Sequence, residues 1–296
     1  MGSLDIPPPH VPSWVVPLHT VLMSIAFLLW SACYVLMTRR SFATKSYGMP
    51  LLALATNVSW EIVNLFYVCE MPLEKIGLAM WLVLDMPIVW ATIKFAPEEW
   101  KDSSKWMGRN IGYVLFLMTA VGCACHYGFT VWWLAERGRG YGEGGGGGGG
   151  GGGGINKDGK FWGGREGFDT SEMAFWSSGV SQVICSWGSL SMLQKRRHSG
   201  GTDYSIWFCR SLGTLVGPVL GYIPLWLYWP EAHGYVVSWL SAFIWGPAIA
   251  CDLAYPFVLR RFRRSEVVLP DGRVTGGRGQ RVPTDKTSAQ DGKKNL

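Results

Sequence analysis

The chain has 296 residues, of which 48% are hydrophobic and only 16% are charged, and its formal net charge is +6. Average soluble domains carry about 25% charged residues, so this chain has too few charges to cover a soluble surface. Its charges lie in short clusters, separated by apolar runs of about 20 residues, the length that crosses the hydrocarbon core of a bilayer. This composition argues against a disordered chain, a secreted disulfide scaffold and a nucleic-acid-binding domain. It predicts an integral membrane protein.

Seven apolar segments predict an all-α membrane protein with seven transmembrane helices. Short alternating strands of about 9–11 residues, which build membrane barrels, are not apparent. Helices satisfy every backbone polar group internally, as a lipid environment requires. In chain order, the expected helices cover about 15–37, 50–69, 77–96, 111–135, 173–193, 206–229 and 234–259.

Lys and Arg residues are unevenly distributed over the two sides of these helices. One side, which includes the C-terminal tail, carries 19 of them, and the other side, which includes the N-terminus, carries six. Cytoplasmic loops are enriched in Lys and Arg. We therefore expect a luminal N-terminus and a cytoplasmic C-terminus, with the endoplasmic reticulum as the expected membrane.

Three parts follow from this topology. Residues 1–14 form a luminal N-terminal segment, residues 15–259 form the membrane domain, and residues 260–296 form a basic cytoplasmic tail that is expected to be disordered. The luminal loop at about 136–172 contains eleven consecutive glycines, which are expected to behave as flexible coil.

Three acidic residues lie well inside expected helices: Glu61, Asp85 and Asp252. A carboxyl group in the membrane interior costs several kcal/mol, and such a residue usually faces the inside of the bundle or a wet cavity. The structural alternative is a hydrogen bond that holds two helices together. Three carboxyl groups in three different helices favour a function.

The second helix carries Asn57, Glu61 and Asn64 on one polar stripe, because residues four and seven apart share a helix face. The two amides are expected to orient Glu61. Burial disfavours the charged form of a carboxyl group, so Glu61 is expected to stay protonated and to serve as a general acid. Asp85 precedes Pro87 by two residues, and it is either a third wall of the same cavity or a stabiliser of a kink.

In the last helix, Trp245, Asp252 and Tyr255 fall on roughly one face. At about 1.5 Å per residue, Glu61 lies about 16 Å and Asp252 about 10 Å from the cytoplasmic ends of their helices. The two carboxyl groups are therefore expected to reach one cavity if their helices are neighbours. Arg210 lies near the cytoplasmic end of the sixth helix, where it either extends to the membrane surface, in a structural role, or pairs with Asp252.

Tryptophan is unusually frequent, with 17 residues. An interfacial aromatic belt explains the tryptophans near helix ends, but it does not explain Trp60 beside Glu61, or Trp245 on the face of Asp252. Aromatic faces attract cations, each by about 0.5–2 kcal/mol. Carboxylic acids and aromatic walls in a dry cavity suit the protonation of an apolar polyene and the carbocation that follows.

Four stretches resemble the integral-membrane terpene cyclases of fungal meroterpenoid and indole-diterpene pathways. The resemblance covers about residues 15–260, and its most specific elements are the Trp–Glu pair in the second helix and the Asp in the last. The glycine tract, the basic tail and parts of the SGGTDYSIW stretch depart from the family pattern, which leaves the head-group specificity open. The stretches are SWEIVNLFY, WLVLDMPIVW, SGVSQVICSWGSLSMLQKRRHSGGTDYSIWFCRSLGT and WGPAIACDLAYP.

The resemblance implies a seven-helix enzyme that cyclises the prenyl chain of a prenylated aromatic precursor, in a lyase- or isomerase-type reaction. The essential Glu and Asp of the family match Glu61 and Asp252, and the residue beside that Glu matches Trp60. A protonated Glu61 or Asp252 would activate a terminal epoxide, and alkenes would then attack in sequence. A pathway prenyltransferase and a flavin epoxidase are expected to act upstream, and the expected partners are the prenylated substrate and the lipid bilayer.

Motifs for metal-dependent chemistry are not found. The sequence has neither a DDxxD motif for a metal–diphosphate complex nor the DxDD motif of soluble protonating cyclases, so we expect no metal and no cofactor. The main alternative is a proton-coupled transporter that uses the intramembrane carboxyl groups as a relay, although no inverted repeat supports it. A seven-helix receptor or light-driven pump and a scaffold within a membrane complex fit the sequence less well.

Overall fold

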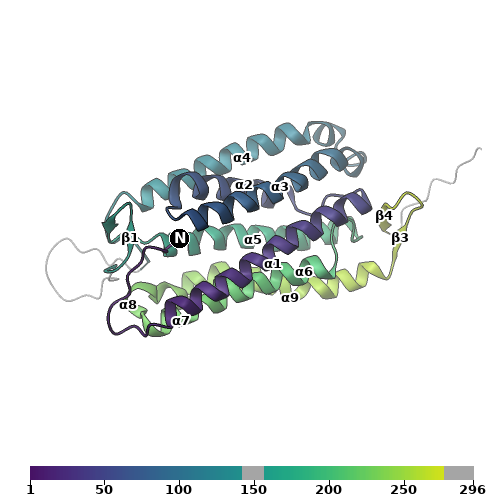
Figure 1. The fold of residues 1–296 in the computed structure, drawn as a ribbon. Helices are drawn as coiled ribbons and strands as arrows, with labels where there is room; N and C mark the ends of the chain where they lie inside the picture. The colour runs from purple at the N-terminus through teal and green to yellow at the C-terminus, as the bar shows by residue number, and fades with distance from the viewer. Residues whose placement is uncertain (142–156, 277–296) are drawn as a thin grey trace, which may run out of the picture.

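The computed structural model describes residues 1–141 and 157–276, and it shows long helices side by side in one elongated bundle (Figure 1). The glycine tract and the last 20 residues lie outside the described residues. The helices are α1 (Val15–Thr44), α2 (Leu51–Val63), α3 (Pro72–Glu99), α4 (Lys105–Trp133), α5 (Thr170–Arg196), α6 (Tyr204–Thr214), α7 (Ile223–Tyr228), α8 (Pro230–His233) and α9 (Trp239–Arg263). Two π-helical segments, η1 (Asn64–Val68) and η2 (Leu215–Gly221), continue α2 and α6, and the 3₁₀ turn η3 (Gly234–Val237) precedes α9. Two short antiparallel hairpins complete the described chain: β1 (Phe161–Trp162) with β2 (Arg165–Glu166), and β3 (Glu266–Val268) with β4 (Val274–Gly276).

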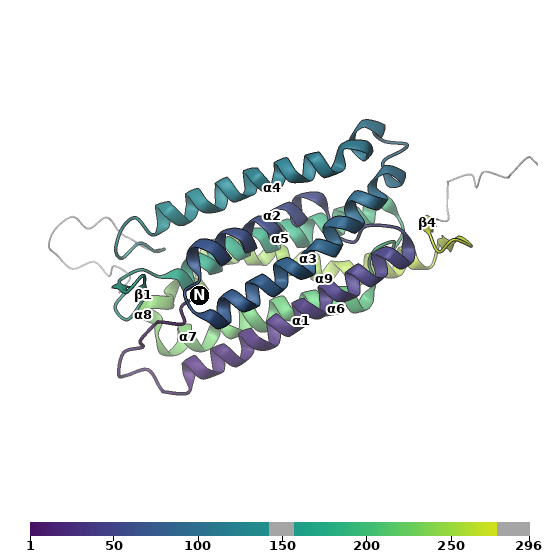
Figure 2. The ribbon, with the colours of Figure 1, turned by 45° about the horizontal axis from the view of Figure 1, so that its top comes forward.

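Six helical stretches of the described chain are long and apolar enough to cross a bilayer, as an integral multi-pass membrane protein requires. They are α1, α2 with η1, α3, α4, α6 through α7, and α9. The fifth expected span corresponds to α5, whose 27 residues are long enough but include seven serines. These serines make α5 more polar than the six stretches named above. In both views α5 runs through the middle of the bundle, between α2 and α9 (Figures 1 and 2).

The helix ends differ from the expected spans by several residues. Most helices are longer than expected because they continue past the apolar stretch that the sequence pattern detects. The last one is shorter at its start: residues Gly234–Val237 form a 3₁₀ turn, and α9 begins only after Ser238. The Ser238 side chain accepts a hydrogen bond from the Ser241 backbone and so caps the helix.

Three glycines in α6 and η2 allow α1 to pack closely against them. Gly213, Gly217 and Gly221 are spaced four residues apart, as in the small-residue motifs that join membrane helices. A β-carbon at Gly217 would lie only 2.6 Å from that of Ala26 on α1, and one at Gly213 would lie 2.9 Å from the Trp30 ring. Larger side chains would therefore push the two helices apart.

The expected disorder of the 260–296 tail does not hold for residues 260–276. Helix α9 continues to Arg263, and the β3–β4 hairpin follows. Gly272, with φ of 86°, forms its turn, and Glu266 accepts hydrogen bonds from the backbone nitrogen and the hydroxyl of Ser199, at 2.9 and 3.0 Å. These contacts order the segment, and the rest of the tail lies outside the described residues.

The bundle has two ends, an amino-terminal face and a carboxy-terminal face. The amino-terminal face carries the N-terminus, the β1–β2 hairpin and α8, and the carboxy-terminal face carries the β3–β4 hairpin (Figure 1). Helix α1 begins at the first face and α9 ends at the second. The chain therefore crosses from one face to the other overall, in agreement with an odd number of passes.

Candidate active site

A pair of buried carboxyl groups lies inside the bundle, where α1, α2 and α3 meet. The side-chain nitrogen of Asn57 lies 3.1 Å from Oε1 of Glu61 and 2.7 Å from Oδ2 of Asp85. The hydroxyl of Tyr34 on α1 accepts a hydrogen bond from Asn57 at 2.8 Å, and it donates one to Oε1 of Glu61 at 3.4 Å. Glu61 and Asp85 are both fully buried. One amide thus joins two acids from neighbouring helices.

The electrostatics of this pair favour a retained proton. Within the described chain neither Glu61 nor Asp85 forms an ion pair, and one oxygen of each has no hydrogen-bond partner. Two negative charges that share one neutral amide would repel each other in a medium of low dielectric constant. The pair is therefore suited to hold at least one proton and to release it to a basic atom.

The local structure of α2 explains which part of the expected polar stripe reaches the pair. Asn57 and Glu61 are four residues apart and lie on one face, so the predicted contact between them is confirmed. Asn64 instead donates to the Trp60 carbonyl at 2.8 Å, where α2 passes into the π-helix η1. No hydrogen bond between described residues joins the Asn64 side chain to Glu61. The prediction that both amides orient Glu61 is therefore half correct.

Asp85 belongs to the pair. Helix α3 continues through Pro87 without interruption, and the Asp85 carboxyl group accepts a hydrogen bond from Asn57 on α2. Asp85 thus faces the same interior as Glu61. The role of Asp85 as a wall of a shared cavity stays a prediction.

Asp252 lies in a different environment, between α5, α6 and α9. Arg210 donates from Nη2 to Oδ1 of Asp252 at 2.7 Å and from Nη1 to the Ser189 hydroxyl at 2.8 Å. The guanidinium also lies 5.2 Å from the ring centre of Tyr255, whose hydroxyl shares a hydrogen bond of 2.9 Å with Thr202. The Arg210 side chain is only 3% exposed. Pairing with Asp252 is thus confirmed, and extension to the membrane surface is wrong.

The two carboxyl sites are separate in the described structure. No hydrogen bond or ion pair between described residues joins the Glu61 site to the Asp252 site, and α5 lies between α2 and α9 (Figure 2). Both sites border one apolar core that includes Cys33, Tyr34 and Cys185. A single cavity that contains Glu61 and Asp252 therefore stays a prediction.

Both tryptophans singled out from the sequence contact α5. Trp60 donates from Nε1 to the Ser177 hydroxyl at 2.9 Å and so ties α2 to α5 beside Glu61. Trp245 on α9 is buried, with its ring centre 5.4 Å from that of Phe175, and its Nε1 has no hydrogen-bond partner. Phe175 also packs against Tyr235, at 5.1 Å, and the Tyr235 hydroxyl is unpartnered as well. This aromatic cluster lies toward the amino-terminal face.

A buried cluster of charges at the amino-terminal face was missed in the sequence. Lys157, only 1% exposed, contacts Asp169 at 2.7 Å and also pairs with Glu172. Lys160 contacts Asp5 at 2.7 Å and donates to Nε2 of His233 at 2.9 Å. These residues hold the N-terminal segment, the loop before α5 and α8 together. The available signal in the sequence was Asp169, which caps the start of α5 by accepting a hydrogen bond from the Glu172 backbone.

Burial and charge set the protonation of this cluster. Burial alone would raise the pKa of Asp169, but the neighbouring Lys157 and Lys160 ammonium groups outweigh it and hold that pKa well below its usual value. Burial, with the charge of Lys160, also lowers the pKa of His233 far below 6.5. His233 is therefore neutral, with Nε2 as acceptor and Nδ1 donating to the Trp229 carbonyl at 3.1 Å. The cluster is structural, since its charges pair with one another.

Within residues 1–141 and 157–276, no group of three or more His, Cys, Asp or Glu side chains is arranged to hold a metal ion. The chemistry that these residues offer is proton transfer from a buried acid and stabilisation of positive charge by a carboxylate and aromatic rings.

Sequence comparison gives the class of enzyme to which this helical membrane bundle belongs. Residues 3–142 and 163–265 match the sequence profile of the Pyr4-like transmembrane terpene cyclases, and the chain belongs to this family. The resemblance to membrane terpene cyclases is thereby confirmed. The chain is a membrane enzyme of a family that cyclises terpenoid precursors.

Individual relatives match over most of their own length and are named terpene cyclases. Terpene cyclase ascF of Acremonium egyptiacum is 35% identical over 268 residues, which are 90% of each chain. The Pyr4-family terpene cyclase mfmH of Annulohypoxylon moriforme is 26% identical over 86% of this chain and 90% of its own. Terpene cyclase pyr4 of Aspergillus fumigatus is 25% identical over 80% of this chain and 83% of its own. No solved structure matches the chain.

Proposed function

We propose that this cyclase protonates the terminal epoxide of a prenylated aromatic precursor, of the meroterpenoid or indole-diterpene kind, and that Glu61 is the proton donor. The observation that carries the proposal is the contact of Glu61 and Asp85 with one amide, that of Asn57, without an ion-pair partner in the described chain. An acid that keeps its proton in an apolar interior is the reagent that this reaction needs.

The proton transfer follows from the geometry of the pair. The epoxide oxygen takes the proton of Glu61, the bond from that oxygen to the more substituted carbon breaks, and the nearest alkene attacks the resulting cation. The Glu61 carboxylate that remains is stabilised by hydrogen bonds from Tyr34 and Asn57. Later alkenes close further rings, and loss of a proton or capture by an internal hydroxyl ends the cascade.

Asp252 receives a different role. Its carboxyl group lies 2.7 Å from the Arg210 guanidinium, whereas Glu61 has no counter-charge in the described chain, so we assign the first proton to Glu61. We assign Asp252 to the stabilisation of positive charge later in the cascade, together with the aromatic rings of Trp245 and Tyr255 on the same helix. The proposal thus gives the two acids different roles.

The topology proposed for the enzyme has seven spans, with α5 as the fifth. Its serines are tolerable in a membrane because α5 lies inside the bundle, where neighbouring helices shield it from lipid. The excess of Lys and Arg on the carboxy-terminal face favours a cytoplasmic location for that face and a luminal N-terminus, in the endoplasmic reticulum. A prenyltransferase and a flavin epoxidase would supply the substrate.

The test uses membranes from a host that expresses the full chain, incubated with a panel of epoxyprenyl arenes and analysed by mass spectrometry. The expected product has unchanged mass and a new retention time. Glu61→Gln should lower its rate of formation by roughly 10²- to 10⁴-fold, the usual contribution of a general acid. Glu98→Gln, which changes an exposed acid in the same way, should leave the rate unchanged. Turnover of no epoxide in the panel would contradict the proposal and favour the proton-coupled transporter.

A further inference from the structure

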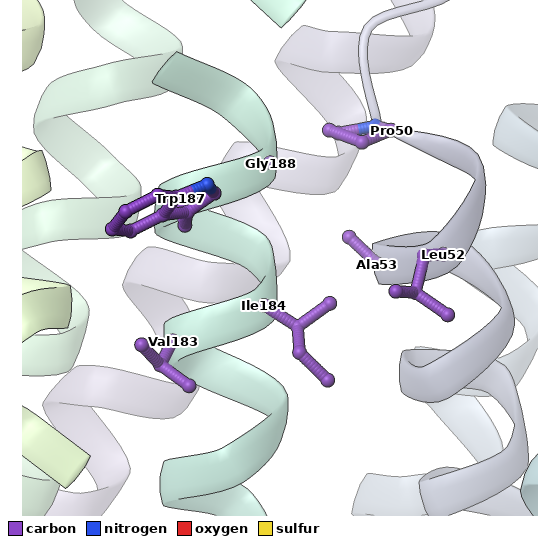
Figure 3. Close-up of a pocket in the computed structure, with 7 residues that line it drawn as sticks. All are labelled: Pro50, Leu52, Ala53, Val183, Ile184, Trp187 and Gly188. Carbon is purple, nitrogen blue, oxygen red and sulfur yellow. The ribbon is translucent and has the colours of Figure 1, made fainter. Parts of the chain in front are cut away.

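Water reaches the interior of a membrane bundle at its ends, because its sides face hydrocarbon that holds no water. A groove of about 270 Å³ between α2 and α5 is typical of such sides, since its walls are apolar throughout (Figure 3). Glu61 lies seven residues before Val68, at the end of η1, and ten residues after Leu51, at the start of α2. At about 1.5 Å per residue, Val68 is within about 10 Å of Glu61 along the helix axis. The amino-terminal face is therefore the shorter path for water to the proton donor.

Residues 1–14, here called the strap, run over the amino-terminal face before α1 begins (Figure 1). Hydrogen bonds hold the first part of the strap to the starts of two long helices. The Gly2 nitrogen donates to Thr170, the first residue of α5, at 3.1 Å, and the Ser3 hydroxyl donates to Glu74 in the first turn of α3. The strap therefore joins α1, α3 and α5 at this end of the bundle.

Lys160 fastens the middle of the strap. Its side chain is only 1% exposed, and its ammonium group lies 2.7 Å from Asp5 in the strap and 3.7 Å from Asp169, which caps α5. The same group lies 4.6 Å from the ring centre of Trp229, just before α8. Asp5 also accepts a hydrogen bond from the Phe161 nitrogen at 3.2 Å. One buried cation thus holds together segments that are far apart in the chain.

Two glycines allow the strap to lie in contact with the rest of this face. Gly159, with φ of 80°, accepts a hydrogen bond from the Ile6 nitrogen at 2.7 Å, and a β-carbon there would collide with the Ile6 carbonyl. Gly2, with φ of 76°, passes equally close to the Ser171 side chain. A larger residue at either position would hold the strap away from its neighbours.

The strap and the β1–β2 hairpin cover the end of α2 that leads to the proton donor. Trp162 in the hairpin donates from Nε1 to the Val68 carbonyl at 3.1 Å. Val11 of the strap belongs to one buried core with Val68 and the first turns of α5. Next to that core, Ser177 accepts the hydrogen bond from Trp60, the neighbour of the proton donor. Packed side chains therefore continue from the strap to the carboxyl pair.

Cyclisation through carbocations requires that water be kept away. The oxygen of a water molecule would form a bond to the cation, and loss of a proton would leave an alcohol in place of the next ring. Closed active sites prevent such side reactions of reactive intermediates. We propose that the strap, fastened by Lys160, closes the amino-terminal end of the bundle against water and thereby determines that the cascade ends within the substrate. This inference rests on the proposed function.

The first measurement does not depend on catalysis. Cys69 follows Val68 below the hairpin and is only 7% exposed. With the full chain in lipid nanodiscs, Lys160→Met should raise the rate at which a water-soluble maleimide labels Cys69 by roughly tenfold, the effect of about 1.4 kcal/mol on a local opening equilibrium. Peptide mass spectrometry separates Cys69 from the other six cysteines. Lys101→Met, which removes an exposed ammonium group after α3 at the other end of the bundle, should leave the rate unchanged.

The second measurement is the product formed in water labelled with heavy oxygen. Lys160→Met should raise, by roughly tenfold, the fraction of cyclic product that carries a labelled hydroxyl group, a change of about 1.4 kcal/mol in the competition between the two endings. Lys101→Met should not change this fraction. Glu61→Gln added to Lys160→Met should abolish the labelled cyclic alcohol. An acyclic labelled diol is not counted, because water opens epoxides without the enzyme.

A second variant keeps the inference testable if Lys160→Met fails to fold. Asp5→Asn removes the charge of the strap's own partner without changing its shape, and it should cause the same two changes to a smaller extent. Unchanged labelling of Cys69 in a folded variant would overturn the inference, as would lower turnover without any labelled cyclic alcohol. Equal changes in Lys101→Met would overturn it as well. Faster labelling of Cys69 in a protein that turns over no epoxide would show that the strap closes this end and that the proposed function has failed.

Discussion

The ion pair between Arg210 and Asp252 should be the most costly single contact to break in the described membrane interior. The two charged groups are 2.7 Å apart, and their side chains are 3% and 8% exposed. Arg210→Met removes the guanidinium and leaves the Asp252 carboxylate buried without its counter-charge. Loss of one partner of a buried pair costs about 3–5 kcal/mol, a large part of the roughly 5–15 kcal/mol by which proteins are stable.

The double variant separates charge from packing. Arg210→Met combined with Asp252→Asn removes both charges, and such replacements of a whole buried pair are often neutral. We therefore expect the double variant to recover most of the stability that Arg210→Met loses, while cyclisation stays low because the Asp252 charge is absent. Arg260→Met at the exposed end of α9 is the control, with an expected change within about 0.5 kcal/mol.

The free energy of unfolding can be measured by titration with sodium dodecyl sulfate in mixed micelles, followed by the fluorescence of the 17 tryptophans. A loss of less than about 1 kcal/mol for Arg210→Met would refute the reasoning, because breaking a buried pair costs about 3–5 kcal/mol. A double variant as unstable as the sum of its two parts would refute it as well, since the two charges would then not be coupled.

Two further predictions concern the amino-terminal face and the packing of α1. The lowered pKa of His233 means that the folded protein keeps the imidazole neutral, whereas the unfolded chain binds a proton below pH 6.5. Its contribution is fully present above pH 6.5 and is lost as the pH falls, by up to about 1.4 kcal/mol per pH unit. His233→Gln should flatten the dependence of stability on pH in thermal unfolding scans, and an identical dependence in both proteins would contradict the assignment. Burial raises the pKa of Asp5, which changes stability with pH in the opposite direction, but equally in both proteins. Gly217→Leu should lower the free energy of unfolding by about 1–3 kcal/mol through overpacking against Ala26. The control is Gly246→Leu, at an exposed position with open space around it, which should cause no such loss. Equal losses from the two variants would show that the close approach of α1 is unimportant.

The spans and the candidate acids could be predicted because both depend on position along a single helix. Glu61, Asp85 and Asp252 stand out as charges in apolar runs, and the i, i+4 spacing of Asn57 and Glu61 is enough to predict their contact. Each of these inferences needs only the geometry of one helix. That is why they agree with the structure.

What could not be predicted depends on which helices are neighbours. The position of a residue along its helix does not show that Asp85 contacts Asn57 or that Asp252 contacts Arg210. The sequence therefore could not distinguish Glu61 from Asp252 as the proton donor. The charge cluster at the amino-terminal face joins Asp5, Lys160 and His233 from three distant segments, and no local pattern brings them together. The bond of the Asn64 side chain to the Trp60 carbonyl, and not to Glu61, likewise has no clear signal in the sequence.

The most direct test of the account is the infrared spectrum of the resting enzyme in lipid, since a protonated carboxylic acid has a carbonyl stretching band that a carboxylate lacks. The account predicts such a band from the Glu61–Asp85 pair. Glu61→Gln should remove or shift it, and Asp252→Asn should leave it unchanged. A band that persists in Glu61→Gln and disappears in Asp252→Asn would place the proton on Asp252 and contradict the assignment of Glu61 as the acid that starts cyclisation.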